Sequence, residues 1–364
     1  MFGGVMDHAV YLKRALELAQ NGWPAALPNP LVGCVIVKDG QIVAEAAHLV
    51  YGGPHAEVNA IAALPSDVDP RQCTVYVTLE PCSHFGKTPP CADLLISREF
   101  QRVIVAVKDP NPLVSGKGIA LLEQAGIQVV SGIAEEEARQ LNRRFFTFHE
   151  QQRPYIVLKW AQSQDGFVSR FPVPANRSQN MISREAAQVL SHELRAQSQA
   201  ILVGKNTVLA DNPSLTLRLA KGRQALRVVL DRHLEIPKQM SVFSEEAPVL
   251  IVNEEKSVQE GHLTYLKIKS GASFLKDLLG ELHKRGIQNL LVEGGTRILQ
   301  VFLDEGLWDE VVVVENPDLR LGSGISAPIF AMKNSFRLVG EDKVFYHYKN
   351  ETLPANGALS REIF

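Results

Sequence analysis

The spacing of apolar positions in the first 150 residues changes repeatedly between a helical and a strand period. Apolar residues recur at helical spacing as far as about residue 21, and the sequence LPNP then ends that pattern. Short apolar runs predict buried strands at residues 31–37, 41–47, 74–79, 103–107 and 128–130. Helices are predicted at residues 56–64, 91–97, 118–125 and, as one long helix, 135–149. Asp39-Gly40 predicts a tight hairpin turn, so this part should form a layered α/β sandwich with a mixed sheet.

A short polar segment at residues 150–154, which ends in proline, predicts a boundary between domains of residues 1–150 and 151–364. A second α/β pattern follows it. Strands are predicted at residues 155–160, 200–203, 227–230, 249–252, 289–292 and 310–314, and helices at residues 183–196, 274–285 and 296–303. The stretch around residues 345–348 could add an edge strand. With 364 residues, each of the two domains can bury its own hydrophobic core.

Composition and charge narrow the possible partners. Hydrophobic residues make up 45% and charged residues 21% of the chain, as in ordinary globular proteins. Residues 1–150 hold 12 Lys and Arg against 16 Asp and Glu, so this half is mildly acidic and lacks the basic excess of proteins that follow a nucleic-acid backbone. Charged residues interrupt the N-terminal apolar pattern and no apolar run is long enough for a membrane span, so we expect a cytoplasmic protein with no membrane partner.

The clearest chemistry lies in two short segments, His55-Ala56-Glu57 and the stretch from Cys82 to Cys91. Zinc accepts imidazole nitrogen and thiolate sulfur, and a catalytic site uses three protein ligands and leaves a fourth position for water. His55, Cys82 and Cys91 supply such a set, and the metal would bring the pKa of water towards neutrality. Glu57 follows the first ligand by two residues and suits a group that moves protons between water and a departing amine.

Two other interpretations of these residues need to be weighed. His55 could be a surface histidine and the cysteines structural, or the site could be a structural zinc site, which would require a fourth ligand such as His84. Cys34 and Cys73 lie in or beside predicted strands and are expected in the core. The generic deaminase pattern places two residues between its cysteines, whereas eight separate Cys82 from Cys91.

The residues around these ligands carry a more specific pattern. They are Pro28-Asn29-Pro30, Val32-Gly33-Cys34, His55-Ala56-Glu57-Val58, the stretch TLEPCSHFGKTPPC that ends at Cys91, and Asp109-Pro110-Asn111-Pro112. Together they closely resemble the deaminase half of the bifunctional riboflavin-biosynthesis deaminase–reductase family, in which eight residues also separate the cysteines. The second half of the chain resembles the reductase domain of the same family, so the resemblance covers nearly the whole chain.

This resemblance implies an N-terminal cytidine-deaminase-like three-layer sandwich with a mixed sheet and a C-terminal dihydrofolate-reductase-like α/β domain. The implied cofactors are Zn²⁺ and NADPH, and the implied substrate is a diaminopyrimidinone that carries a ribosylamino 5-phosphate. A homo-oligomer is also expected. Residues implied on the substrate side of the deaminase pocket are Asn29, His48, Lys87, Asp109 and Asn111. Lys87 offers a charge to a phosphate, whereas asparagines beside proline, such as Asn29 and Asn111, are equally typical of turns.

Three stretches carry the resemblance in the second half: residues 159–166, residues 194–196 followed by 201–207 and 211–218, and Val292-Glu293-Gly294-Gly295-Thr296-Arg297. They imply NADPH contacts at Ala161, Thr207, Asp211, Gly295, Thr296, Arg297, Ile298, Leu299, Gln300 and Val301. They imply substrate contacts at Lys159, Arg195, Leu215, Arg218 and Glu293. Guanidinium groups match phosphate oxygens, a carboxylate can orient ribose hydroxyls, and Asp211 could handle protons during ring opening. The alternative is that Arg195 and Asp211 are surface charges.

The second half also departs from the family. Gln164 stands where an apolar residue is usual, and Met181-Ile182-Ser183 replaces a Trp-Ile-Ser/Thr stretch. The cofactor contacts of residues 169–183 are therefore not carried over. We expect zinc-dependent hydrolytic deamination, followed by NADPH-dependent reduction of the ribosyl group to ribityl. Two alternatives remain at this stage: a zinc deaminase that acts on nucleic acid, and a deaminase whose C-terminal domain is degenerate and non-catalytic.

Overall fold

A computed structural model describes residues 7–83, 89–173 and 180–349. These residues form two units that divide between Gln152 and Arg153, and each unit has its own central sheet and hydrophobic core. No helix in the described part of the chain combines the length and the apolar character that crossing a membrane requires.

The first unit contains five strands in the order β2-β1-β3-β4-β5. They are β1 (Gly33–Lys38), β2 (Gln41–Ala47), β3 (Cys73–Leu79), β4 (Arg102–Val107) and β5 (Gln128–Ser131). β1 is antiparallel to both β2 and β3, whereas β3, β4 and β5 are parallel, so the sheet is mixed as predicted. The turn between β1 and β2 places Asp39 and Gly40 at φ angles of 51° and 79°, the left-handed conformation that Asp-Gly hairpin turns favour.

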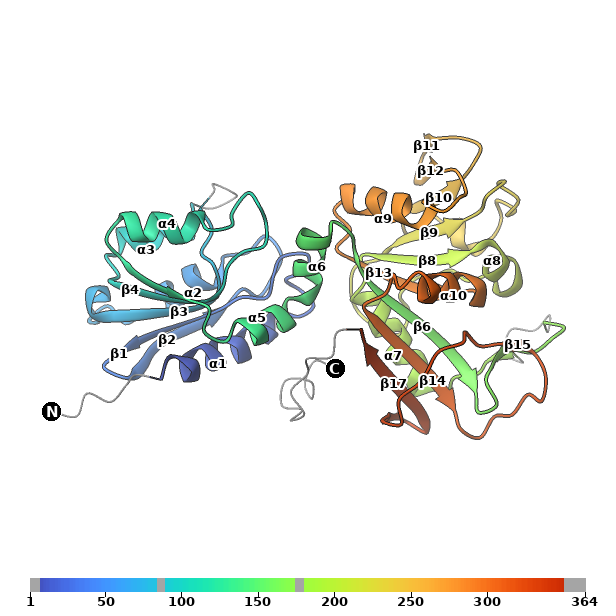
Figure 1. Ribbon diagram of the computed structural model, residues 1–364, viewed down its shortest axis with the longest axis horizontal. Helices are drawn as coiled ribbons and strands as arrows, with labels where there is room; N and C mark the ends of the chain where they lie inside the picture. The colour runs from blue at the N-terminus through green and yellow to red at the C-terminus, as the bar shows by residue number, and fades with distance from the viewer. Residues whose placement is uncertain (1–6, 84–88, 174–179, 350–364) are drawn as a thin grey trace. The chain divides into compact units, whose positions relative to one another are not determined.

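Helices cover both faces of this sheet (Figure 1). They are α1 (His8–Ala19), α2 (Ala56–Ala62), α3 (Cys91–Ser97), α4 (Lys117–Gln124), α5 (Glu135–Leu141) and α6 (Arg143–Gln151). Alternate residues of the strands point to opposite faces: Cys34 and Ile36 pack with α2, α3 and α4, whereas Val35 and Val37 pack with α1, α5 and α6. The result is the expected three-layer sandwich.

The predicted helix over residues 135–149 is wrong in one respect, because it is broken into α5 and α6 at Asn142. The side chain of Asn142 explains the break. Its Oδ1 accepts a hydrogen bond from Leu31 N at 2.7 Å, and its Nδ2 donates one to Leu31 O at 2.9 Å. Asn142 is buried, and its φ of −103° and ψ of 25° depart from helical values. The hydrogen bonds to Leu31, which is distant in the sequence, therefore replace regular helix geometry at this residue.

The second unit contains a ten-stranded sheet in the order β11-β12-β10-β9-β8-β13-β6-β14-β17-β16. Its predicted central strands are β6 (Tyr155–Ser163), β8 (Ala200–Gly204), β9 (Leu226–Leu230), β10 (Val249–Asn253), β13 (Asn289–Gly294) and β14 (Glu310–Asn316). The strands from β12 to β14 in this order run parallel, and those at both margins are antiparallel.

Helices cover both faces of the second sheet (Figure 1). α7 (Glu185–Ala196) and α8 (Lys205–Asp211) pack on one face, whereas α9 (Phe274–Lys284) and α10 (Thr296–Asp304) pack on the other. The strands carry near-continuous runs of buried aliphatic residues, as expected for a parallel sheet that is covered on both faces.

The margins of the second sheet were the least predictable part. The strand expected near residues 345–348 is β17 (Asp342–Tyr348), but it is not an edge strand, because β16 (Arg337–Val339) pairs with its outer side. The sequence pattern also missed α8 and several short strands. These strands are β7 (Phe167–Ser169), β11 (Val258–Glu260), β12 (Leu263–Lys267) and β15 (Ile325–Ser326). Most of these strands have only three to five residues, too few for a clear alternation of apolar and polar positions.

Candidate active sites

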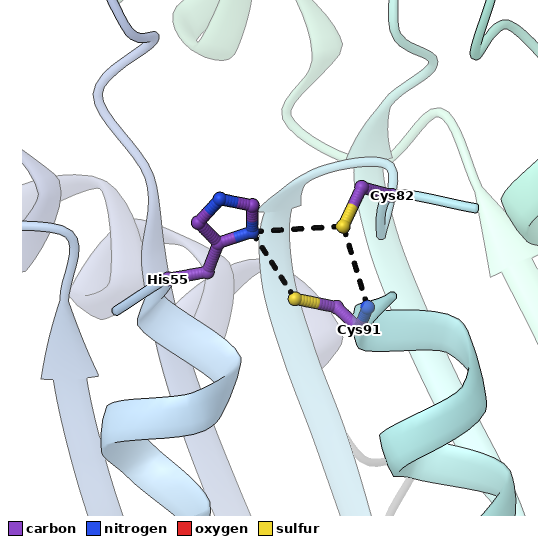
Figure 2. A group of neighbouring side chains, drawn as sticks. All are labelled: His55, Cys82 and Cys91. Carbon is purple, nitrogen blue, oxygen red and sulfur yellow. Dashed lines mark hydrogen bonds between the residues drawn. The ribbon is translucent and has the colours of Figure 1, made fainter. Parts of the chain in front are cut away.

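Three predicted metal ligands converge in the first unit. His55 immediately precedes α2, Cys91 opens α3, and Cys82 lies in the segment after β3. Figure 2 shows the three side chains turned towards one another, with His55 Nδ1 at 3.3 Å from Cys91 Sγ and 3.6 Å from Cys82 Sγ. Their donor atoms all lie within 4.8 Å of one another, and no other such group of ligand side chains occurs in the described part of the chain.

The chemistry of these donors fits a zinc ion. The backbone N–H of Cys91 donates a hydrogen bond to Cys82 Sγ at 3.3 Å. Hydrogen bonds from the Cys91 side chain and from His55 lower the pKa of Cys82, whereas the hydrogen bond with Cys82 and burial raise the pKa of Cys91, so Cys82 carries the thiolate of the pair. One nitrogen and two sulfurs match the ligand set of a catalytic site, which keeps a fourth position for water. His84, the candidate for a fourth ligand, lies outside the described residues.

Glu57 lies in the first turn of α2 and is only 3% exposed. Its carboxyl group faces the ligand cluster, since His55, Cys82 and Cys91 all influence its ionisation. Burial raises the pKa of Glu57 to about 7. A carboxyl group with a pKa near neutrality can both accept and release a proton, which is the property that a proton shuttle needs.

His48 is buried beside the cluster, and its ring meets the ring of His55 edge-on with centroids 5.6 Å apart. Its Nε2 accepts a hydrogen bond from Asn29 Nδ2 at 3.0 Å, so its Nδ1 carries the proton and donates to Pro54 O at 2.9 Å. Burial lowers the pKa of His48, which keeps the ring neutral. The structure thus brings two of the predicted substrate residues, Asn29 and His48, to the metal ligands.

The other predicted substrate residues of this unit have different surroundings. Asp109 is buried, and its Oδ1 accepts a hydrogen bond from Asn111 N at 2.8 Å. Asn111 Oδ1 in turn accepts one from Leu113 N at 3.1 Å, so Asn111 takes part in the turn chemistry that was its alternative interpretation. Their contact with substrate stays a prediction. Lys87 lies outside the described residues.

Glu80 is a site residue that the sequence reasoning missed. Its buried carboxylate accepts four backbone hydrogen bonds, from Asp109, Gly116, Gly118 and Ile119, at 2.9 to 3.3 Å. Glu80 thereby joins the segment that contains Cys82 to the loop that contains Asp109 and to the start of α4. The available signal was an acidic residue directly after a strand in which all seven residues are buried.

Close packing reinforces this junction. A Cβ atom added to Gly118 would lie 1.9 Å from Pro81 O, so only glycine allows α4 to approach the metal-ligand segment this closely. The hydrogen bonds of the Glu80 carboxylate and the absence of a side chain at Gly118 both affect the start of α4. Together they fix the distance between the segment with Cys82 and α4.

Charged side chains gather at a second site, in the second unit. Arg195 on α7 and Glu293 on β13 form two hydrogen bonds, Nε to Oε1 at 2.7 Å and Nη2 to Oε2 at 2.6 Å. Their side chains are only 11% and 9% exposed, so Arg195 is not a surface charge. Lys159 on β6 lies close enough to influence both, and burial lowers its pKa. Burial opposes ionisation of Glu293, but Arg195 and Lys159 outweigh it and hold the pKa of Glu293 below its usual value.

The remaining predicted substrate contacts lie on the segment after α8. Arg218 is exposed, whereas Leu215 is 4% exposed, packs in the hydrophobic core and has a φ of +55°. The side chain of Leu215 therefore contributes to folding, and its contact with substrate stays a prediction.

Several predicted cofactor residues meet where α8 and α10 begin. Thr207 Oγ1 lies 3.1 Å from the position of a Cβ on Gly295 and 3.8 Å from that on Gly294. Ile298 covers Gly204, where an added Cβ would lie 2.3 Å from its side chain. The N-terminal ends of both helices thus lie beside glycines, where a side chain would crowd Thr207 or Ile298. Asp211 ends α8, and Ala161 packs against the core from β6.

Residues that depart from the family pattern take part in local contacts. Gln164 Oε1 accepts a hydrogen bond from Arg320 Nε at 2.8 Å. Met181 is 45% exposed, whereas Ile182 is buried and its carbonyl accepts a hydrogen bond from Asn316 Nδ2 at 2.8 Å.

Comparisons with known proteins match both units. Residues 6–107 match the family model described as the cytidine and deoxycytidylate deaminase zinc-binding region, and residues 154–339 match the model of the RibD C-terminal domain. A riboflavin biosynthesis protein RibD from Aquifex aeolicus is 43% identical over 87% of this chain and 88% of its own length. The protein of the same name from Escherichia coli is 38% identical over 87% of this chain and 89% of its own length.

Solved structures agree with this match. A diaminohydroxyphosphoribosylaminopyrimidine deaminase/5-amino-6-(5-phosphoribosylamino)uracil reductase from Thermotoga maritima has a TM-score of 0.79 and 36% identity. The match covers 93% of this chain and 97% of that one. A RibD from Acinetobacter baumannii has a TM-score of 0.80 and 34% identity, over 94% of this chain and 98% of its own.

Proposed function

This chain belongs to the family of bifunctional riboflavin-biosynthesis deaminase–reductases, and we propose that its substrate is 2,5-diamino-6-ribosylamino-4(3H)-pyrimidinone 5′-phosphate. The protein is a zinc-dependent deaminase and an NADPH-dependent reductase. In our proposal the first reaction removes an amine from the pyrimidine ring, and the second reduces the ribosyl group of the deaminated product to ribityl. The two activities in the name of the relative from Thermotoga maritima, which is similar over nearly its whole length, support these two substrates.

We assign deamination to residues 1–150 and reduction to residues 151–364. The positions of the two family models support this division, since the zinc-binding model ends at residue 107 and the reductase model begins at residue 154. The division of the chain between Gln152 and Arg153 agrees with it to within two residues.

For deamination, His55, Cys82 and Cys91 would hold zinc, as their converging donor atoms support. When bound, zinc supplies a Lewis acid that makes water nucleophilic near neutral pH. Glu57 would take the proton from that water and deliver it to the departing amine, because it is buried beside the ligands and has a raised pKa.

Contacts to the ring and phosphate would come from the remaining residues of this pocket. Both ring nitrogens of His48 are already hydrogen-bonded, to Asn29 and to Pro54 O, so we propose that His48 lines the pocket and holds Asn29, whose Oδ1 and second N–H can face a pyrimidine edge. We propose that Asp109 and Asn111 contact the substrate from the loop that Glu80 holds, and that Lys87 contacts its phosphate.

For reduction, we propose that NADPH binds along Ala161, Thr207, Asp211 and the segment from Gly295 to Val301. The close approach of Thr207 to the two glycines supports this assignment. NADPH supplies the reducing equivalent when it is bound. Substrate would contact Lys159, Arg195, Leu215, Arg218 and Glu293. Arg195 and Glu293 orient each other through two hydrogen bonds, and Asp211 would handle the proton released on ring opening.

One observation carries this proposal: a buried carboxylic acid, Glu57, stands beside one nitrogen and two sulfur ligands whose donor atoms lie within 4.8 Å of one another. The test measures ammonia release and NADPH oxidation separately on the diaminopyrimidinone phosphate. We expect ammonia release without NADPH, and NADPH oxidation only after deamination. NADPH oxidation before any ammonia release would contradict the proposed order of reactions.

We further propose that the protein acts as a homo-oligomer in the cytoplasm on free small molecules, with no nucleic-acid partner. The acidic balance of residues 1–150 supports the last point. An RNA-binding measurement at low and high salt tests it. Tight binding that weakens steeply with salt would favour a nucleic-acid substrate instead.

A further inference from the structure

His192 lies at the reductase site, although no role has been assigned to it so far. It precedes Arg195 by three residues on α7, so the two side chains lie on the same face of the helix. His192 is 5% exposed. Its Nδ1 accepts a hydrogen bond from the backbone N–H of Arg218 at 3.2 Å. This contact joins α7 to the segment that carries an expected substrate arginine.

That hydrogen bond determines the tautomer of the ring. Because Nδ1 is an acceptor, the proton of the neutral imidazole must be on Nε2. Burial lowers the pKa of His192, and the nearby charges of Arg195, Arg218 and Lys159 also lower it, while Glu293 opposes them. His192 therefore stays uncharged near neutral pH and presents Nε2–H as a donor.

The Nε2–H group has no hydrogen-bond partner among the residues that the structure describes. His347 Nε2 also has no hydrogen-bond partner among these residues, but it is sealed from solvent. His192 Nε2 is not sealed in this way, so a ligand atom could reach it. The exposed guanidinium of Arg218 likewise has no ion-pair partner in the described ranges. An uncharged donor and an unpaired cation thus come from two residues that a hydrogen bond joins.

We propose that His192 is a substrate-binding and positioning residue of the reductase site: its Nδ1 fixes the backbone of Arg218, and its Nε2–H donates to an oxygen of the substrate phosphate. This inference rests on the proposed reduction of a phosphorylated ribosyl group. Arg195 is already paired with Glu293, so Arg218 is the guanidinium available to an added phosphate. A neutral imidazole can donate a directed hydrogen bond to the phosphate, and because it is uncharged it does not repel the guanidinium of Arg218.

The variant His192→Asn separates the two contacts, because asparagine Oδ1 can replace the Nδ1 acceptor but the side chain is too short to replace Nε2–H. With the phosphorylated product of deamination, KM of the reductase should rise about ten- to hundredfold while kcat changes little, as expected for loss of a hydrogen bond to a charged group. The matched control is His283→Asn on α9, on the opposite face of the sheet, which should leave KM unchanged.

A second readout distinguishes phosphate binding from a general structural role. With the same substrate after removal of its phosphate, wild type and His192→Asn should have the same KM. Inorganic phosphate should compete with substrate in the wild type, and its inhibition constant should rise in the variant by the same factor as KM. An equal loss with both substrates, or an unchanged KM for the phosphorylated one, would overturn the inference.

Two controls distinguish a failure of this inference from misfolding of the variant and from a failure of the proposed function. NADPH binding, followed by fluorescence, reports whether the reductase unit of each variant is folded. If His192→Asn does not bind NADPH, His192→Gln serves instead, because glutamine keeps a donor at the distal position and should preserve selectivity for the phosphorylated substrate. Loss of that selectivity in a folded His192→Gln would refute Nε2–H as the donor. Absence of reduction by the wild type would instead count against the proposed function.

Discussion

The two units assemble their reactive groups in different ways. In the first unit, the metal ligands His55, Cys82 and Cys91 come from two short segments of sequence, at the ends of neighbouring elements. In the second unit, Lys159, Arg195 and Glu293 come from β6, α7 and β13, which are far apart in the chain. The first site is therefore visible as a motif, whereas the second exists only once the sheet has formed.

The sites also differ in how they balance charge. The negative charge of the thiolate in the first site would be balanced by a bound metal ion, which the chain itself does not supply. The second site pairs its own charges, since Arg195 and Glu293 neutralise each other with both side chains nearly buried. We therefore expect the first site to depend on an added ion and the second to depend on the stability of the fold.

Removal of the metal should produce the largest difference between the two sites. Treatment of the full chain with a chelator should reduce ammonia release to the background rate, because no Lewis acid then activates water. NADPH oxidation on substrate that has already been deaminated should be unchanged. Return of zinc should restore ammonia release, and a parallel loss of both activities would show that the metal supports more than the first site.

The variant Glu57→Gln should sharpen the comparison within the first site. Because glutamine cannot carry the proton, ammonia release should fall by a factor of about 10² to 10⁴. Zinc content, measured by elemental analysis, and NADPH oxidation on deaminated substrate should stay at wild-type values. Ammonia release at a near wild-type rate would remove Glu57 from its proposed role.

The variant Glu293→Gln should test the second site through stability. Breaking a buried ion pair leaves Arg195 uncompensated, so the free energy of unfolding of the second unit should fall by about 3 to 5 kcal/mol. The control is Glu281→Gln, which breaks an exposed pair with Lys284 in the same unit and should cost less than about 1 kcal/mol. Urea unfolding measures both, and equal effects would contradict the account of a buried pair.

Acidification should weaken the same ion pair. The pKa of Glu293 is held below its usual value, so its contribution to stability is complete above the ordinary glutamate pKa and is lost as the pH falls through the lowered value. Glu293→Gln should therefore unfold with a weaker dependence on pH in the acidic range than the wild type.

The variant Glu80→Gln should have the smallest effect of the set. Glutamine keeps one acceptor oxygen, so part of the four-fold backbone contact survives, and the loss should be about 1 to 3 kcal/mol in the first unit. Glu45→Gln provides the control, since Glu45 is a more exposed carboxylate that pairs with Arg14. A larger effect from Glu45→Gln would show that the junction at Glu80 is not the stabilising contact that we describe.

Local patterns predicted much of the molecule because they report local physics. The Asp39-Gly40 turn, the apolar run of β1 and the continuous apolar runs of the parallel strands were all predictable without tertiary information. Asn142 was not, since the break between α5 and α6 depends on hydrogen bonds to Leu31, which is 111 residues away. The hydrogen bond between His192 and Arg218 was hidden for the same reason.

The prediction of site residues also succeeded where the signal was local and failed where it depended on tertiary contacts. The resemblance to a known family named Arg195 and Glu293 separately, but only the structure shows that they form one buried pair. Glu80 was overlooked because its partners are backbone N–H groups, which leave no trace in residue types. Contacts between side chains and backbone are thus the part of a site that sequence patterns describe least.

The junction at Glu80 and Gly118 has a consequence for engineering this enzyme. A designer who wished to redirect the deaminase towards another heterocycle would first exchange the loop around Asp109. That loop cannot be transplanted alone, because its backbone is anchored to the segment beside Cys82 and α4 packs directly on Pro81. The two segments behave as one interchangeable module, so libraries that recombine relatives should keep both from the same parent.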